Sequence, residues 1–198
     1  MNKADDSSRP TRLADHAEEN LRFIRSTMEQ AGVFTGISGL GYLLTGLTAM
    51  ITAWIAAPYA PEMQANIWMV ELLIATCVAS TFTVRKTRRQ GRSIRLATTR
   101  KLLGAFLPAM IAGGLLTLAG YVHNFHSLLP GIWLTLYGAA VMTAGAWSVR
   151  VLPSMGALFM VIGSIALLLP DLGNTLMGIG FGSLHCVFGF IIWRRYGG

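Results

Sequence analysis

Apolar residues in this chain form six long runs that contain no Lys or Arg. Each run is close to the roughly 17 to 25 residues that cross the hydrocarbon core of a membrane as a helix. The runs lack the regular polar positions that one face of a soluble helix or strand would carry. The pattern therefore predicts an all-α, polytopic membrane protein whose six transmembrane helices lie at about residues 32–57, 66–84, 105–122, 129–149, 153–170 and 174–193.

Composition agrees with a membrane protein, because 53% of the residues are hydrophobic and 13% are charged. A typical soluble domain has about 25% charged residues. The polar residues concentrate in residues 1–31 and in a basic loop at 85–104, so we expect an N-terminal cytoplasmic segment followed by a transmembrane domain at 32–198. The N-terminal segment lacks the short basic start of a cleaved signal peptide, and we expect it to be retained.

The N-terminal segment carries an amphipathic pattern within residues 13–31. Its apolar positions advance by steps of three and four, which predicts a helix. Glu18 with Arg22, and Arg25 with Glu29, are four apart and can pair along the exposed face. This helix has three candidate positions: in the membrane interface, beneath the bundle, or paired with a second copy.

Basic residues fall on one side of the predicted topology. Of the 16 Lys and Arg, five precede the first run, eight lie between the second and third, and the others are Arg150, Arg194 and Arg195. Since basic residues near span ends stay on the cytoplasmic side, we expect a multi-pass protein of the cell (inner) membrane with both termini in the cytoplasm. All Trp residues lie near span ends, as interface anchors do: Trp54, Trp68 and Trp133 outside, Trp147 and Trp193 inside.

The basic loop is expected to contact anionic lipid, because each basic residue near the membrane surface attracts such lipid by about 1 kcal/mol. A docking site for a cytoplasmic partner is the alternative. The net charge of +7 does not indicate nucleic acid, since the charges lie directly against the membrane. The predicted lipid-contact residues are Arg85, Lys86, Arg88, Arg89, Arg92 and Arg95.

Glycines seven residues apart recur and predict three helical hairpins, at about 32–84, 105–149 and 153–194. Residues seven apart return to nearly the same helix face, and small residues let membrane helices approach closely. Packing surface is the first interpretation, and room for a ligand or substrate path is the second. The pairs are Gly39/Gly46, Gly113/Gly120, Gly138/Gly145, Gly156/Gly163 and Gly182/Gly189, while the second span has none.

Residues of the third hairpin resemble those of a known family of membrane proteins. Met155-Gly156-Ala157-Leu158 through Gly163, then Leu169-Pro170, then Gly182 to Gly189 and a terminal Arg resemble the HdeD-type acid-resistance membrane proteins of bacteria. That resemblance implies a small six-span fold and a stress-related role, without catalytic residues. The segments Asn20 to Arg25 and Gly180 to His185 are also similar to an uncharacterised family of bacterial membrane proteins.

Two ionisable residues lie inside the predicted spans, Glu71 and His185. Such groups are costly in a membrane and usually face the bundle interior. Glu71 lies three residues past Trp68, so it is either a shallow group that reaches water or a neighbouring Thr, or a site for a proton or cation. His185 is expected to hydrogen-bond to another helix, with Tyr137 as a candidate partner; a proton-linked or cofactor role is the alternative.

His123 and His126 lie three apart in a predicted outer loop, near Glu62 and Asp171 on other loops. Such a group is either solvated or a divalent-metal site. No phosphate loop, dinucleotide fingerprint or metalloprotease motif is present, so neither an enzyme nor a cofactor is expected.

These patterns favour a non-enzymatic integral membrane protein that acts through helix packing, homo-oligomerisation or binding to a membrane-complex partner. The alternative is a small proton-linked or cation transporter or channel, with Glu71 and His185 lining a path.

Overall fold

The computed structural model describes residues 15–24, 36–89 and 97–196, and within these ranges it is helical with no β-strand. Residues 15–24 form a helix inside the predicted amphipathic segment. Arg22 and Glu18 approach to 3.2 Å on its exposed surface. The predicted pair Arg25/Glu29 lies outside the described residues.

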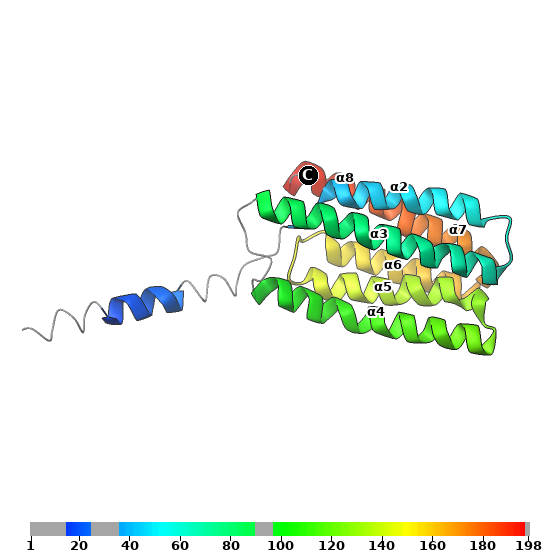
Figure 1. Ribbon diagram of the computed structural model, residues 1–198, viewed down its shortest axis with the longest axis horizontal. Helices are drawn as coiled ribbons and strands as arrows, with labels where there is room; N and C mark the ends of the chain where they lie inside the picture. Colours follow the sequence, from blue (N-terminus) through cyan, green and yellow to red (C-terminus); the bar gives the residue numbers. More distant parts are fainter. Residues whose placement is uncertain (1–14, 25–35, 90–96, 197–198) are drawn as a thin grey trace, which may run out of the picture.

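The remaining described chain is a bundle of long helices (Figure 1). The segments long and apolar enough to cross a membrane are α2, α3, α4, His126–Gly145, which comprises η1 and α5, and Pro170–Tyr196. The predicted fifth span corresponds to α6, a shorter apolar helix of 17 residues. The bounds are α2 Gly39–Ala56, α3 Pro61–Arg89, α4 Ala97–His123, η1 His126–Leu128, α5 Leu129–Gly145, α6 Leu152–Leu168, η2 Pro170–Leu172, α7 Gly173–Met177, η3 Gly178–Leu184 and α8 His185–Tyr196.

Polar and proline residues set several helix ends. The Ser38 hydroxyl accepts a hydrogen bond from the Gly41 N–H at 3.2 Å and caps α2. Proline begins α3 and stands in the first turn of α5 and of α6, where its missing N–H costs nothing. Asn124, between α4 and η1, has a φ of 57°, a backbone conformation that Asn tolerates well.

The helices form two groups of three that meet in the middle of the bundle. In one group α2 packs against α3, α8 and the η3 segment; in the other α5 packs against α4 and α6. The α5–α6 contact is the most extensive. The two groups meet around α7 and η3, where Leu134 of α5 and Phe159 of α6 lie against Gly180.

Glycine strips make the closest helix contacts. Gly46 of α2 faces the Gly182 carbonyl, and a Cβ on Gly46 would come within 2.7 Å of that oxygen. Gly138 and Gly156 face one another across α5 and α6 in the same manner, at 2.7 Å and 2.6 Å from the opposing carbonyl. An added Cβ would also meet neighbouring atoms at every other glycine of the five pairs: Gly39, Gly113, Gly120, Gly145, Gly163, Gly182 and Gly189.

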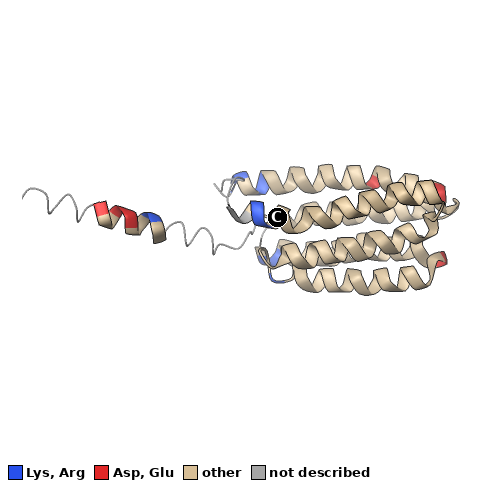
Figure 2. Ribbon diagram, turned by 90° about the horizontal axis from the view of Figure 1, so that it is seen from below, with Lys and Arg blue, Asp and Glu red and all other residues tan. Residues whose placement is uncertain are grey.

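Charges separate along the bundle, with Lys and Arg at one end and acidic residues toward the other (Figure 2). Three of the Trp residues are exposed near helix ends: Trp54, Trp147 and Trp193. Trp68 and Trp133 differ from the predicted interface anchors, because both rings are buried. Their indole N–H groups donate to Asn174 and Thr117, both at 2.9 Å, so these rings belong to the core.

Candidate functional site

Glu71 of α3 is only 5% exposed, and both of its carboxyl oxygens bond to α2. Oε1 lies 2.7 Å from the Thr48 hydroxyl, and Oε2 lies 3.1 Å from the Thr52 hydroxyl. Thr48 and Thr52 are four residues apart and therefore lie on one face of α2. The side chain is thus held between two helices by hydroxyl groups, without an ion pair in the described chain.

Trp68 is a core residue, so the position of the carboxyl is better measured from the end of α2. Thr52 and Thr48 are four and eight residues before the end of α2 at Ala56. At 1.5 Å per residue they lie about 6 and 12 Å inside that end. Two neighbouring Thr hydroxyls, those of Thr48 and Thr52, hydrogen-bond to Glu71.

His185 lies in the second polar cluster and is 3% exposed. Its Nε2 is 2.8 Å from the Tyr137 hydroxyl of α5, and the Tyr137 hydroxyl also interacts with that of Tyr42 on α2. Four rings enclose the imidazole, with centroids 5.1 to 6.0 Å away: Tyr42, Tyr137, Phe159 and Phe181.

A π-helical segment, η3, ends immediately before His185. The carbonyls of Gly180 and Phe181 are close enough to the imidazole to interact with it, yet Nδ1 makes no hydrogen bond of normal geometry in the described chain. π-Helical turns are rare and often occur at functional sites. The repeated glycines of this segment do not indicate a π-helical turn in the sequence.

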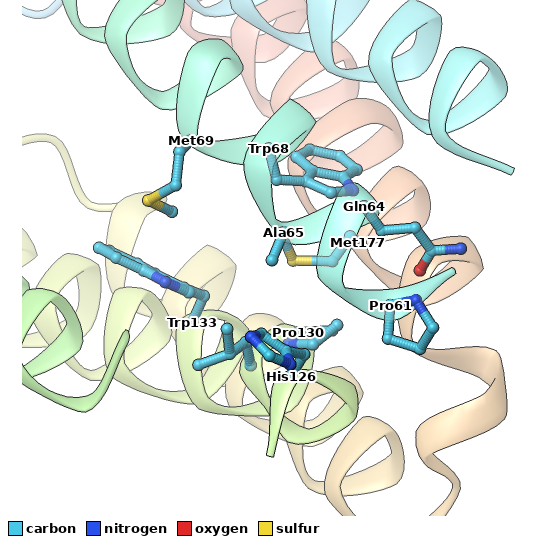
Figure 3. Close-up of a pocket in the computed structure, with 10 residues that line it drawn as sticks. Pro61, Gln64, Ala65, Trp68, Met69, His126, Pro130, Trp133 and Met177 are labelled. Carbon is cyan, nitrogen blue, oxygen red and sulfur yellow. The ribbon is translucent and has the colours of Figure 1, made fainter. Parts of the chain in front are cut away.

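A cavity of about 20 Å³ lies between the starts of α3 and α5 (Figure 3). That volume is close to what one water molecule needs. Its lining includes Trp68, Met69, His126, Trp133 and Met177. Glu71 and His185 do not line it.

The two loop histidines do not converge. His123 is exposed, whereas the Nε2 atom of His126 is buried without a hydrogen-bond partner, and the His126 ring packs on Tyr121 at 4.9 Å. Within the described residues no three His, Cys, Asp or Glu side chains gather as a metal site would require.

The basic loop divides into two kinds of side chain. Arg85, Arg88 and Arg89 are exposed at the end of α3. Lys86 is buried and donates to the Ile37 carbonyl at 2.9 Å, so it ties α3 to the start of α2 and is not presented to lipid. Arg92 and Arg95 lie outside the described residues.

Sequence reasoning missed one surface, the outer face of α4. Gly104 and Gly114 are the only glycines of the described chain with open space where a Cβ would lie. They belong to a stripe that advances by three, four, three and four residues, and every member is exposed. We call it the α4 stripe: Gly104, Leu107, Ile111, Gly114 and Leu118.

Comparison of the chain with protein-family models, with curated proteins and with solved structures found no match. Its own residues are therefore the basis for a functional proposal.

Proposed function

We propose that this protein is a six-span inner-membrane protein, built as three hairpins with both termini in the cytoplasm, that acts by associating with a second copy of itself through the α4 stripe. The function is an interaction rather than a reaction. The long apolar helices and the separation of charge along the bundle support the membrane location.

The proposal rests on Gly104 and Gly114 of α4, which have open space where a Cβ would lie. Elsewhere in the described bundle, glycine marks a place where another residue comes close. Membrane helices use small residues for this purpose because lipid is as apolar as Leu and close packing is what favours association. Gly104 and Gly114 are small residues of the kind that let helices pack closely, yet no atom of the described chain lies within 4 Å of where their Cβ would be.

The pattern of the α4 stripe fits a second helix rather than lipid alone. Alternating steps of three and four are the spacing that places residues in the seam between two helices. α4 has room for a partner, because only 11% of its most apolar stretch is buried and its main contact is with α5.

A second copy is the partner that the stripe fits best. Two copies inserted in the same direction present the same face at the same depth. A twofold axis along the membrane normal would then bring Gly104 near Gly104 and Gly114 near Gly114, as in a self-complementary interface. The exposed Arg85, Arg88 and Arg89 would lie toward one end of such a dimer and bind anionic lipid.

Transport along a path shared by Glu71 and His185 has less support. Each group is hydrogen-bonded within its own cluster, and the cavity lies beside neither.

Native mass spectrometry of the protein in lipid nanodiscs or mild detergent tests the proposal. We expect a dimer for the wild type and a monomer for Gly114→Leu, because the added side chain fills the space for the partner helix. Ser80→Leu is the matched control, since it adds bulk to an exposed position of α3, and it should leave the dimer intact. A monomeric wild type, or a dimer that Gly114→Leu does not weaken, contradicts the proposal.

A further inference from the structure

Thr48 shares a single hydroxyl proton between two acceptors. Its Oγ1 lies 2.7 Å from Glu71 Oε1 and 2.9 Å from the Thr45 carbonyl oxygen of its own helix. A hydroxyl has one proton to donate and can accept from others. The proton therefore goes either to the carboxyl or to the helix carbonyl.

Each choice fits a different state of Glu71. An ionised carboxylate is an acceptor only, so Thr48 must then donate to Oε1 and leave the Thr45 carbonyl. A protonated carboxyl can donate to Thr48 Oγ1, and Thr48 then keeps its bond to Thr45. Thr52, 3.1 Å from Oε2, donates in both states. The contacts of the site can accommodate both forms through rotation of one hydroxyl.

Among the described residues, the side chains that interact with this carboxyl are Thr48 and Thr52, and neither is charged. Helix α3 packs mainly on α2 and touches η1, and it hydrogen-bonds to α4 and α7. The titratable side chains of these elements are Tyr42 of α2, His126 of η1, and Arg100, Lys101, Tyr121 and His123 of α4, while α7 has none. An ionised Glu71 would therefore lack a counter-charge in the described bundle, which is costly in an apolar setting.

From this geometry we infer that Glu71, Thr48 and Thr52 form a site that binds and releases a single proton between α2 and α3. A proton fits better than a metal cation. The hydroxyls lie in direct hydrogen-bond contact with the carboxyl oxygens, whereas a cation such as Ca²⁺ needs six to eight oxygen ligands around it.

Binding or release of the proton would change a hydrogen bond within α2. When Glu71 is ionised, Thr48 releases the Thr45 carbonyl; when Glu71 is neutral, that back-bond forms again. Hydrogen bonds from Thr to the preceding turn bend helices. α2 also packs on η3 and α8 through its glycines, so a change in its curvature would reach the helix that carries His185. This site does not depend on self-association through the α4 stripe.

Infrared spectroscopy of the full chain in liposomes, titrated with acid and base, tests the inference. We expect a protonated-carboxyl C=O band that disappears reversibly at high pH. Glu71→Gln should lack this band, whereas Glu62→Gln, which removes an exposed acid from the same helix, should retain it. A band unchanged in Glu71→Gln would overturn the inference.

Two further measurements keep the test decisive if Glu71→Gln folds poorly. Thr48→Val should move the band to higher frequency because the carboxyl loses a hydrogen-bond partner, and Thr48→Ser should restore it; no shift in Thr48→Val contradicts the site. Replacing sodium with choline should leave the titration midpoint unchanged, and a midpoint that follows sodium or calcium concentration identifies a cation site instead.

Discussion

The Tyr137 hydroxyl lies 2.8 Å from Nε2 of His185 and is its only hydrogen-bond partner of normal geometry within the described residues. The two residues come from α5 and from the start of α8, so this bond joins the two three-helix groups at the centre of the bundle. Four aromatic rings surround the imidazole.

Removal of the Tyr137 hydroxyl should destabilise the bundle. In Tyr137→Phe, both nitrogens of His185 are buried without a partner, and an unsatisfied buried polar group costs about 1–3 kcal/mol. The unfolding midpoint in detergent should fall accordingly. Tyr59→Phe changes the same chemical group at a position that is exposed and should unfold like the wild type. Equal midpoints for both variants would mean that the bond is not a central contact.

Glycines that face backbone should not tolerate a methyl group. In Gly156→Ala the new Cβ would lie 2.6 Å from the Gly138 carbonyl oxygen and 2.6 Å from the Met142 nitrogen. Because backbone atoms cannot rotate away, α5 and α6 must separate, at a cost of about 1–3 kcal/mol. Gly104→Ala adds the same group where nothing lies within 4 Å, and its gain in helix propensity of up to about 1 kcal/mol should stabilise the protein. Denaturant titrations of both variants measure the difference, and a loss of stability in Gly104→Ala as large as in Gly156→Ala contradicts the packing.

The basic end of α3 should bind anionic lipid through its arginines and not through Lys86. Replacing Arg85, Arg88 and Arg89 with Gln removes about 1 kcal/mol of attraction per residue, or roughly fivefold in affinity for each. Native mass spectrometry of co-purified phosphatidylglycerol measures this loss.

Lys86→Gln is the control for that experiment. Since the Lys86 ammonium donates to the Ile37 carbonyl, the substitution should lower stability and leave lipid retention near the wild-type value. Lipid loss in Lys86→Gln as large as in an arginine variant would show that its side chain reaches the membrane surface.

The helical fold follows from the sequence because long apolar runs have few alternatives in lipid, where the backbone must satisfy its own hydrogen bonds. Five of the predicted spans correspond to segments long and apolar enough to cross a membrane, and the remaining one corresponds to α6, a shorter apolar helix. Proline stands at the starts of α3, α5 and α6, and the apolar runs alone did not define these boundaries. The π-helical turn before His185 has no comparable signal in the sequence; in the structure η3 packs chiefly on α2.

The candidate site was only partly predictable for a related reason. The cost of an acid in an apolar run singled out Glu71, with water or a neighbouring Thr as its possible partner, but the choice of Thr48 and Thr52 depends on how α2 and α3 cross. Trp68 and Trp133 resemble interface anchors by position, yet each has an inward polar partner that sequence spacing cannot reveal. Lys86 is a similar case, because it lies among exposed arginines but donates to the Ile37 carbonyl, 49 positions away in the sequence.

Disulfide crosslinking in native membranes tests the central claim of self-association through the α4 stripe most directly. Ile111→Cys, made in a chain with Cys77→Ser and Cys186→Ala, places one thiol in the middle of the stripe. We expect a covalent dimer on mild oxidation. A chain that keeps only the native Cys77, which is exposed on α3, should form no covalent dimer. A dimer through Cys77 with none through position 111, or no dimer in either chain, would contradict the account.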